Sequence, residues 1–427
     1  MRIALRLAAL AALLPAGAAS AATLIHAGRL IDGTAAAPRE RVTVVVEGDR
    51  IRSIDAGFRA PGEGDVVVDL SGGTVLPGFM DMHVHLTGES SPTSEIDAIK
   101  QGETDEAFDT VVYAKRTLLA GFTTVRNLGD SWNTTIALRR AIAAGKIEGP
   151  RIFTAGRPIG TRGGHADATN SFGPFLKSDD PRANTICSGA DGCRDAVRQR
   201  YKDGADSIKI TATGGVLSLA KSGSAPQFTD EEIAAIVSTA HDYGMKVAAH
   251  AHGAEGIKRA VRGGIDSIEH GTFMDDEGIR LMKEHGTHYV PTISAGKFVY
   301  EKAQDPSYFP AIVRPKALEV GPQIQGTFAK AWKAGVTIMF GTDTGVGPHG
   351  SNGKEFGYMV EAGMPVLDAI RSATMVPARY LGIDDRLGSV EAGKVADIVG
   401  VPGDPVADVH VLERVSFVMK EGVIYKR

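Results

Sequence analysis

The sequence predicts an α/β protein: a (β/α)8 TIM barrel with a small β-sandwich domain made from both terminal segments. Three observations predict this architecture. Through the middle of the chain, short buried strand-like segments alternate with helical stretches, as they do in parallel βα units. At both ends, short alternating strands are separated by turn residues instead. The total length suits one large barrel plus a small second domain.

Residues 1–21 have the pattern of a secretory signal peptide. Two arginines near the start precede an apolar run from Leu7 to Leu14, and Ala19-Ser20-Ala21 forms a small-residue cleavage site. The apolar run is too short to span a bilayer, and we expect no membrane span in the mature chain. We therefore expect cleavage near Ala22 and an exported protein, periplasmic or secreted. An uncleaved anchor is the alternative.

The two terminal segments, 22–74 and 379–427, are expected to form the β-sandwich domain together. The first contains alternating strand segments such as 42–46 and 66–70, with turn residues between them. The C-terminal segment repeats this pattern, and short strands are expected there at 388–390, 396–399, 409–412, 417–419 and 423–425.

Residues 75–378 are expected to form the barrel. A helix is predicted from Asp230 to His241, because Thr229 stands at the N-cap and Glu232 at the capping-box position. An open doubly wound sheet is the alternative fold, but no glycine fingerprint for a dinucleotide follows the first strand. The eight expected strands are 79–82, 123–126, 151–154, 207–210, 247–249, 267–269, 288–290 and 337–340.

Composition narrows the possible partners and suggests one cross-link. The chain carries 47 basic and 51 acidic residues, a net charge of −4, so it has no basic footprint for a nucleic acid. Only two cysteines occur, Cys187 and Cys193, with five residues between them. In an oxidising compartment they would close a small loop, and we expect a disulfide, with two free thiols as the alternative.

Six side chains that can bind metals lie at or near the ends of the predicted strands. In a barrel the carboxyl ends of all strands meet at one mouth, where active sites are built. Any one of these histidines alone would more simply be a hydrogen-bonded structural residue. The collective arrangement predicts a single metal site instead, built from His83, His85, Lys209, His250, His270 and Asp343.

The residue types in this set indicate hydrolysis with two metal ions. Neutral imidazole and carboxylate are the usual ligands of zinc-like cations. The ammonium of Lys209 has no lone pair, but carboxylation by carbon dioxide would make it a carboxylate that can bridge two cations. Such a pair activates water and polarises a carbonyl group. Asp343 is then expected to accept a proton and pass it to the leaving group. His252, two residues after His250, is expected to polarise the carbonyl or stabilise the oxyanion.

Five motifs resemble the amidohydrolase superfamily. They are Gly78-Phe79-Met80-Asp81-Met82-His83-Val84-His85, Lys209 within Ser-Ile-Lys-Ile, Ala249-His250-Ala251-His252-Gly253, Ile268-Glu269-His270-Gly271 and Gly341-Thr342-Asp343. The chain is most similar to the prolidase-like binuclear group. This group includes bacterial Xaa-Arg, Xaa-Lys and Xaa-Pro dipeptidases and ochratoxin-hydrolysing amidohydrolases. The resemblance covers nearly the whole mature chain.

The resemblance implies a role for each residue of the set. His83, His85 and Asp343 would bind the more buried metal, and His250 and His270 the second. Carboxylated Lys209 would bridge two divalent ions, which we expect to be Zn²⁺, and His252 would handle the substrate carbonyl without binding metal. A deaminase is disfavoured because such relatives lack the bridging lysine.

Three further residues are weaker candidates for substrate binding. Arg162 and His165 lie in the loop after the third strand, and His349 lies in the loop after the eighth. We expect a metal-dependent hydrolase that cleaves the amide bond to a C-terminal amino acid, as a carboxypeptidase or dipeptidase does. Ochratoxin A, which would release phenylalanine, is one candidate substrate. The alternatives are an enzyme that opens a cyclic amide or lactone, and a non-catalytic barrel scaffold. We also expect a homo-oligomer.

Overall fold

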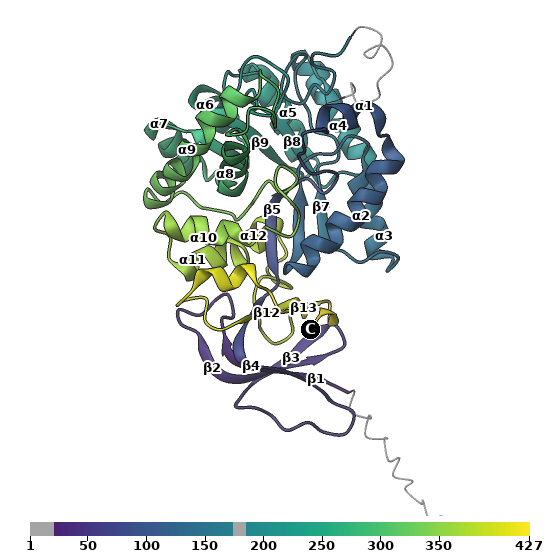
Figure 1. Cartoon of the computed structure of the whole chain (residues 1–427), viewed down its shortest axis with the longest axis vertical. Coiled ribbons are helices and arrows are strands. Elements are labelled where there is room, and N and C mark those ends of the chain that lie inside the picture. The colour runs from purple at the N-terminus through teal and green to yellow at the C-terminus, as the bar shows by residue number, and fades with distance from the viewer. Residues whose placement is uncertain (1–20, 174–184) are drawn as a thin grey trace, which may run out of the picture.

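The computed structural model describes residues 21–173 and 185–427. The predicted signal peptide therefore lies outside the described residues, apart from residue 21. Strands from both ends of the chain pair in one seven-stranded sheet, in the order β14-β13-β12-β4-β1-β2-β3. Figure 1 shows these purple and yellow segments together below the helical part of the molecule. The strands are β1 (Thr23–Leu30), β2 (Arg39–Glu47), β3 (Arg50–Ala56), β4 (Val66–Pro77), β12 (Ile398–Pro402), β13 (Phe417–Lys420) and β14 (Val423–Lys426).

The contact between the two ends runs along β4, which pairs in antiparallel fashion with β12. Side chains from both ends also share one buried cluster, in which Ile25 and Val44 lie with Ile398 and Phe417. The ladders of the described residues form one sheet, so the second layer of a sandwich stays a prediction. β4 leads through Gly78 directly into the first strand of the central part.

Two of the predicted C-terminal strands are wrong. Residues 409–412 lie in a 3-10 helix, Val409–Glu413, because the Asp408 carboxylate accepts a hydrogen bond from the His410 backbone N–H and caps this turn. The segment 388–390 is not a strand either, although the Val390 N–H donates to the carbonyl of Asp32.

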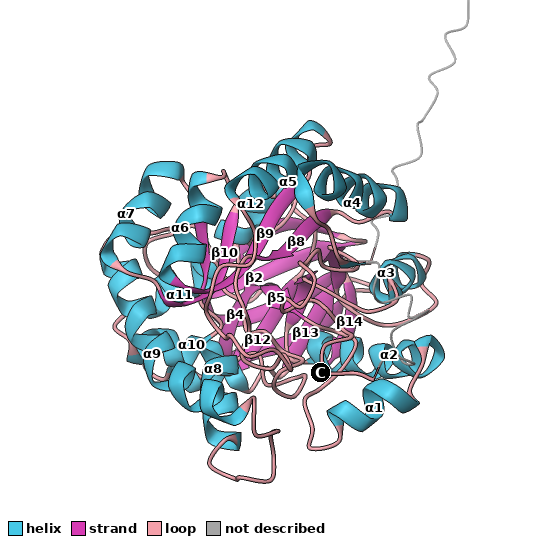
Figure 2. Cartoon of the chain, turned by 90° about the horizontal axis from the view of Figure 1, so that it is seen from above, coloured by secondary structure: helices cyan, strands magenta, loops and turns pink. Residues whose placement is uncertain are grey.

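The central part contains two parallel sheets, β5-β6-β7 and β11-β10-β9-β8. Figure 2 shows their strands surrounded by helices, as expected for βα units. The strands are β5 (Phe79–Val84), β6 (Phe122–Asn127), β7 (Arg151–Thr154), β8 (Ser207–Thr211), β9 (Lys246–Gly253), β10 (Ser267–Phe273) and β11 (His288–Val290). The helices are α1 (Ser94–Lys100), α2 (Glu103–Leu119), α3 (Thr134–Ala143), α4 (Gly189–Asp203), α5 (Asp230–Asp242), α6 (Ala254–Arg262), α7 (Asp276–His285), α8 (Ile293–Lys302), α9 (Arg314–Lys333), α10 (Lys354–Glu361), α11 (Val366–Ser372) and α12 (Met375–Leu381).

Seven of the eight predicted barrel strands are present, and the eighth is different. Segment 337–340 forms only an isolated bridge to β11, at Tyr289 and Ile338. The Phe340 carbonyl accepts from the Met82 N–H of β5 at 2.9 Å, but the Phe340 N–H donates to Ser372, outside the sheet. A ladder cannot form where alternate groups bond elsewhere. The segment thus lies between β11 and β5. Among the described residues, the strands do not form a continuous eight-stranded ladder.

Two local predictions are confirmed. The helix predicted at 230–241 is α5, and Thr229 and Glu232 form the expected capping box at its start. A disulfide joins Cys187 and Cys193. It ties the end of the long loop after β7 to helix α4, because Cys193 lies within that helix. Within the described residues, we find no helix that combines the length and the apolar character needed to cross a membrane.

Candidate metal centre

The structure brings the six predicted ligands and His252 together around one cavity of about 280 Å³. The cavity lies at the carboxyl ends of the parallel strands, which is where active sites occur in this architecture. Most of these side chains come from strands, and the other two lie within three residues after a strand or the bridged segment. His83 lies in β5, Lys209 in β8, His250 and His252 in β9 and His270 in β10, while His85 follows β5 and Asp343 follows segment 337–340.

Hydrogen bonds fix which nitrogen of His83 and His85 carries the proton. His83 Nδ1 lies 2.9 Å from the carboxylate of Glu269, and His85 Nδ1 lies 3.0 Å from the carbonyl oxygen of Gly129. Both oxygens accept, so each Nδ1 must carry a hydrogen. The Nε2 of each ring therefore keeps its lone pair, and both Nε2 atoms lie near the same oxygen of Asp343.

In His250 the roles of the two ring nitrogens are reversed. Its Nε2 donates to the carbonyl of Gly214 at 3.0 Å, so Nδ1 is the atom with the lone pair. His270 Nδ1 lies 2.7 Å from the hydroxyl of Thr292, which leaves Nε2 for another partner. The two rings lie edge to face, with centroids 4.7 Å apart. Each of the four predicted histidine ligands thus has one nitrogen engaged by the protein and one available, as metal-binding histidines do.

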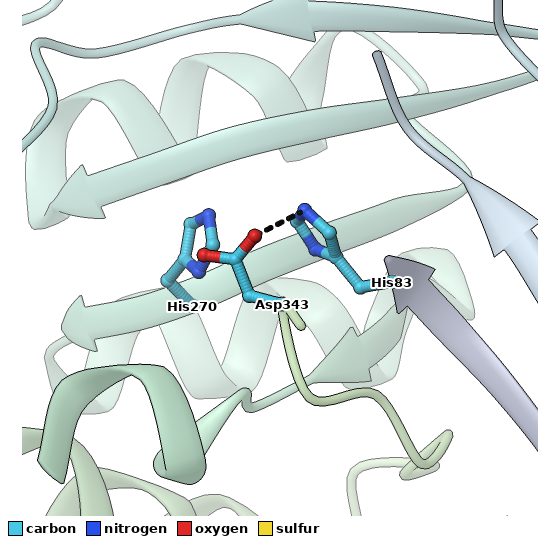
Figure 3. Close-up of side chains that lie close together, drawn as sticks. All are labelled: His83, His270 and Asp343. Carbon is cyan, nitrogen blue, oxygen red and sulfur yellow. Dashed lines mark ion pairs between the residues drawn. The ribbon is translucent and has the colours of Figure 1, made fainter. Parts of the chain in front are cut away.

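Asp343 and Lys209 lie beside His83. Oδ1 of Asp343 lies 3.4 Å from His83 Nε2 and 3.3 Å from His85 Nε2. The Lys209 Nζ lies 3.3 Å from His83 Nε2. Figure 3 shows the Asp343 carboxylate between the rings of His83 and His270. Ligand atoms of Asp343, His83 and His270 all lie within 4.8 Å of one another, so these three side chains belong to one site that could hold metal.

Burial sets the charge state of the cavity. It lowers the pKa of His83 to about 4 and places the pKa of His250 and His270 well below the usual value, so these rings are neutral. Burial by itself raises the pKa of Asp343, but its interactions with His83, His85 and the Lys209 ammonium outweigh burial and hold the value at about 2. The cavity therefore presents neutral imidazoles and an ionised carboxylate, the forms that bind divalent cations.

Two of these residues have an unusual backbone conformation. His270 and Asp343 have φ values of 70° and 57°, in the left-handed region that side chains other than glycine rarely adopt. The Tyr289 hydroxyl donates to the His270 carbonyl at 2.8 Å, and the Asp343 N–H donates to the His83 carbonyl at 2.7 Å. Such conformations cost on the order of 1–3 kcal/mol per residue, and these hydrogen bonds help to hold them in place.

Glu269 is a functional residue that sequence reasoning missed. It is fully buried, it binds His83 Nδ1, and it forms an ion pair with Arg126 at 2.8 Å. Burial raises the pKa of Glu269, but Arg126 and His83 outweigh it and bring the value to about 2. A signal was present, because a glutamate and an arginine each stand within an apolar strand, where a lone charge is costly.

We expect Glu269→Gln to weaken metal binding by about 10–100-fold, because the amide holds His83 less firmly. We also expect a loss of about 3 kcal/mol of stability, because the Arg126 guanidinium is left buried beside a neutral group. Metal content after dialysis against a chelator and the melting temperature check both effects. The matched control is Glu255→Gln on the surface of α6, which should change neither. Retention of metal like the wild type would remove Glu269 from the site.

The structure places the three weaker candidates for substrate binding in different environments. His165 lines the cavity, and its ring centroid lies 4.2 Å from that of His250. Arg162 does not line the cavity, because its side chain is exposed on the loop. His349 lies elsewhere too: it stacks on Tyr113, and its Nε2 is 3.1 Å from the Gly88 carbonyl. The structure therefore supports only His165 among the three as a residue beside the site.

The donor set fits a pair of divalent cations. Four imidazoles each present one free nitrogen, Asp343 adds a carboxylate, and the Lys209 amine lies beside His83 in the same cavity. Nitrogen and carboxylate oxygen are the ligands that zinc and similar ions prefer.

Comparison with known proteins agrees with this chemistry. Residues 74–425 match the family model described as "Amidohydrolase family". The chain is 29% identical over 440 residues to ochratoxinase from Aspergillus niger, an alignment that covers 95% of this chain and 86% of that protein.

Solved structures give the same result for the fold. A Xaa-Pro dipeptidase crystallised with methionine in its active site is 54% identical and matches with a TM-score of 0.92, covering 95% of this chain and 100% of the other. A prolidase complexed with N-methylphosphonate-L-proline is 31% identical, with a TM-score of 0.84 and the same coverage of both chains.

Proposed function

The chain belongs to the amidohydrolase family, and from this premise we propose that it hydrolyses the amide bond between an acyl group and a C-terminal amino acid. That it is a hydrolase acting on amide bonds follows from the family and its ochratoxinase and prolidase relatives. The observation that carries the proposal is the convergence of four imidazoles, one carboxylate and one buried lysine on a single cavity. The relatives named for cleavage of such bonds support it.

The family usually uses a binuclear metal site. We assign His83, His85 and Asp343 to one cation, and His250 and His270 to the other. Zinc suits this mixture of nitrogen and oxygen ligands. When bound, two such ions polarise the substrate carbonyl and make a water molecule more acidic.

Lys209 becomes a ligand in this proposal through reaction with carbon dioxide. Burial lowers the pKa of its amine to about 8, so part of it is neutral near neutral pH. The lone pair of the neutral Nζ adds to the carbon of CO2, and the nitrogen then loses one proton, which gives a carbamate anion. The carbamate has two oxygens, so Lys209 would supply one ligand oxygen to each of the two cations.

Asp343 and His252 perform the proton transfer and the polarisation. The ionised Asp343 carboxylate accepts a proton from water and returns it to the more basic nitrogen of the leaving group. His252 Nδ1 lies 2.8 Å from the Thr272 hydroxyl. When this hydroxyl donates to Nδ1, the proton of the neutral ring is on Nε2. That N–H can then stabilise the oxygen that gains negative charge.

One part of the cavity wall indicates what the leaving amino acid contains. It is apolar, with Val299, Val320 and Ile324 among the side chains that line it. We therefore expect an apolar side chain on the released amino acid, which includes the phenylalanine of ochratoxin A. We also propose export, because the Cys187–Cys193 disulfide is typical of oxidising compartments.

The test is a hydrolysis screen of the zinc-loaded enzyme with N-acyl amino acids, dipeptides and ochratoxin A, and with cyclic amides and lactones alongside. Release of a free amino acid with an apolar side chain is the expected result. The control is the same enzyme after removal of metal by a chelator, which should be inactive until zinc is restored. The proposal would be contradicted if the enzyme hydrolysed lactones alone. It would also be contradicted if enzyme with two bound metals hydrolysed no amide.

A further inference from the structure

A second cavity of about 510 Å³ adjoins the metal cavity. The two cavities share His165 and Leu217 in their walls. The second cavity is lined by segment 90–92 and the start of α1, by the loop after β7, by the loop after β8 and by the segment before α9. It therefore lies next to the catalytic groups but is built almost entirely from loops, the parts of such folds that set specificity.

An apolar surface connects the two cavities. Val216, Val299 and Val320 of the metal cavity belong to the same hydrophobic cluster as Phe309 and Val313 of the second cavity. This cluster is separate from the main core. A substrate that extends from the metals into the second cavity would keep contact with apolar side chains along its length.

A buried lysine holds the loop at the junction of the two cavities in place. Lys316 of α9 is buried, and its ammonium donates to the carbonyls of Gly215, Ser218 and Ala220 at 3.1, 2.7 and 2.9 Å. These bonds fix the carbonyls on either side of Leu217. A side chain at Gly215 would place its Cβ 2.2 Å from the His165 ring, so glycine is required for the ring to lie beside His250. These contacts hold the loop around Leu217 and the His165 ring in place, so the junction between the cavities has a defined shape.

The second cavity differs from the metal cavity in charge. Among the described residues that line it are two acids, Glu95 and Asp167, and no lysine or arginine. Asp167 is buried, and its carboxylate accepts hydrogen bonds from Gly163 and Thr169. An anionic group would therefore meet the negative charge of Glu95 and Asp167 there.

We propose that the second cavity is a subsite for the acyl end of an elongated substrate, and that it selects large, uncharged or cationic, partly aromatic groups over anionic ones. This inference rests on the proposed function. The free carboxylate of the leaving amino acid is disfavoured beside Glu95 and Asp167, so the acyl group and not the amino acid enters this cavity. Phe309 and the ring of Tyr308 supply the apolar contact.

Three substrates with the same leaving amino acid, the best one from the screen above, test the proposal. They carry an N-acetyl, an N-(2-naphthoyl) or an N-succinyl group. The naphthoyl substrate should exceed the acetyl substrate at least tenfold in kcat/KM, mainly through KM. The succinyl substrate should be the poorest of the three. If acetyl is hydrolysed and naphthoyl is no better, the subsite is wrong although the proposed function stands; if none is hydrolysed, the proposed function itself fails.

Two variants test whether the preference for the naphthoyl group arises in the second cavity. Ala98→Trp puts a bulky ring where α1 lines the second cavity, and the naphthoyl-to-acetyl ratio of kcat/KM should fall about tenfold. The matched control is Lys100→Trp on the same helix, which lines neither cavity and should leave the ratio as it is. Glu95→Lys should raise the succinyl-to-naphthoyl ratio at least fivefold. The assignment is overturned if the naphthoyl-to-acetyl ratio stays the same in Ala98→Trp and the succinyl-to-naphthoyl ratio stays the same in Glu95→Lys. It is also overturned if the naphthoyl-to-acetyl ratio falls equally in Lys100→Trp.

Discussion

Replacement of Asp343 by asparagine is expected to lower kcat for amide hydrolysis at least ~10³-fold. The amide of asparagine is nearly the same size as the carboxylate, but it cannot accept a proton from water at neutral pH. It also removes the negative charge that lies near both His83 Nε2 and His85 Nε2. The cation assigned to these residues should therefore bind less tightly as well.

Two measurements separate the lost proton transfer from lost metal. Metal content after gel filtration reports on binding, and single-turnover kinetics at saturating zinc report on the chemical step. Because His83 and His85 hold the pKa of Asp343 at about 2, the wild-type carboxylate is ionised throughout the neutral range, and the loss should persist from pH 6 to 9. The matched control is Asp385→Asn, whose side chain is 77% exposed, and which should keep full activity. Full turnover by Asp343→Asn would remove the residue from the mechanism.

The sequence predicted which six side chains gather around one cavity because its signal is local. Each candidate stands at or just after a short apolar strand, and parallel strands place their carboxyl ends together. His83 and His85 are two apart and emerge on the same side, as strand periodicity requires. No knowledge of loop shape is needed for such residues.

Loop residues could not be placed in this way. Arg162 and His165 are only three positions apart, yet one is exposed and the other lies against His250. The position of His165 depends on Gly215, which belongs to a different loop, and that loop depends on Lys316 of α9. Contacts between loops distant in sequence carry no periodic signal, which is why His349 was predicted near the substrate and lies beside Tyr113 instead.

The short strands show a second limit of sequence patterns. Segment 409–412 has the composition of a strand, but one carboxylate, that of Asp408, favours a helical turn. Segment 337–340 lies where the eighth strand was predicted, yet its hydrogen bonds go partly outside the sheet. In both cases hydrophobicity correctly predicted burial, whereas hydrogen bonds to single neighbouring groups decided the backbone conformation.

Replacement of Lys209 by alanine is expected to have a comparable effect, a loss of at least ~10³-fold in kcat, for a different reason. The variant removes the amine that becomes the bridging carboxylate, and no other described carboxylate side chain except Asp343 lines this cavity. Metal analysis should find fewer than two ions per chain at zinc concentrations that saturate the wild type. The control is Lys246→Ala at the start of β9, where the side chain is 46% exposed and pairs with Asp266.

Carboxylation makes two further outcomes specific to Lys209. Metal-free wild-type enzyme should regain activity with zinc faster when bicarbonate is added, because CO2 supplies the carbon of the carbamate. The alanine variant should ignore bicarbonate but recover part of its activity with a short carboxylic acid such as propionate, which can occupy the space left by the side chain. Burial of Lys209 among His83, Glu269 and Asp343 would also suit a plain lysine whose charge is balanced by the two acids. Reactivation that is independent of bicarbonate, together with two tightly bound ions in the alanine variant, would favour that simpler role, because a balancing ammonium contributes no ligand oxygen.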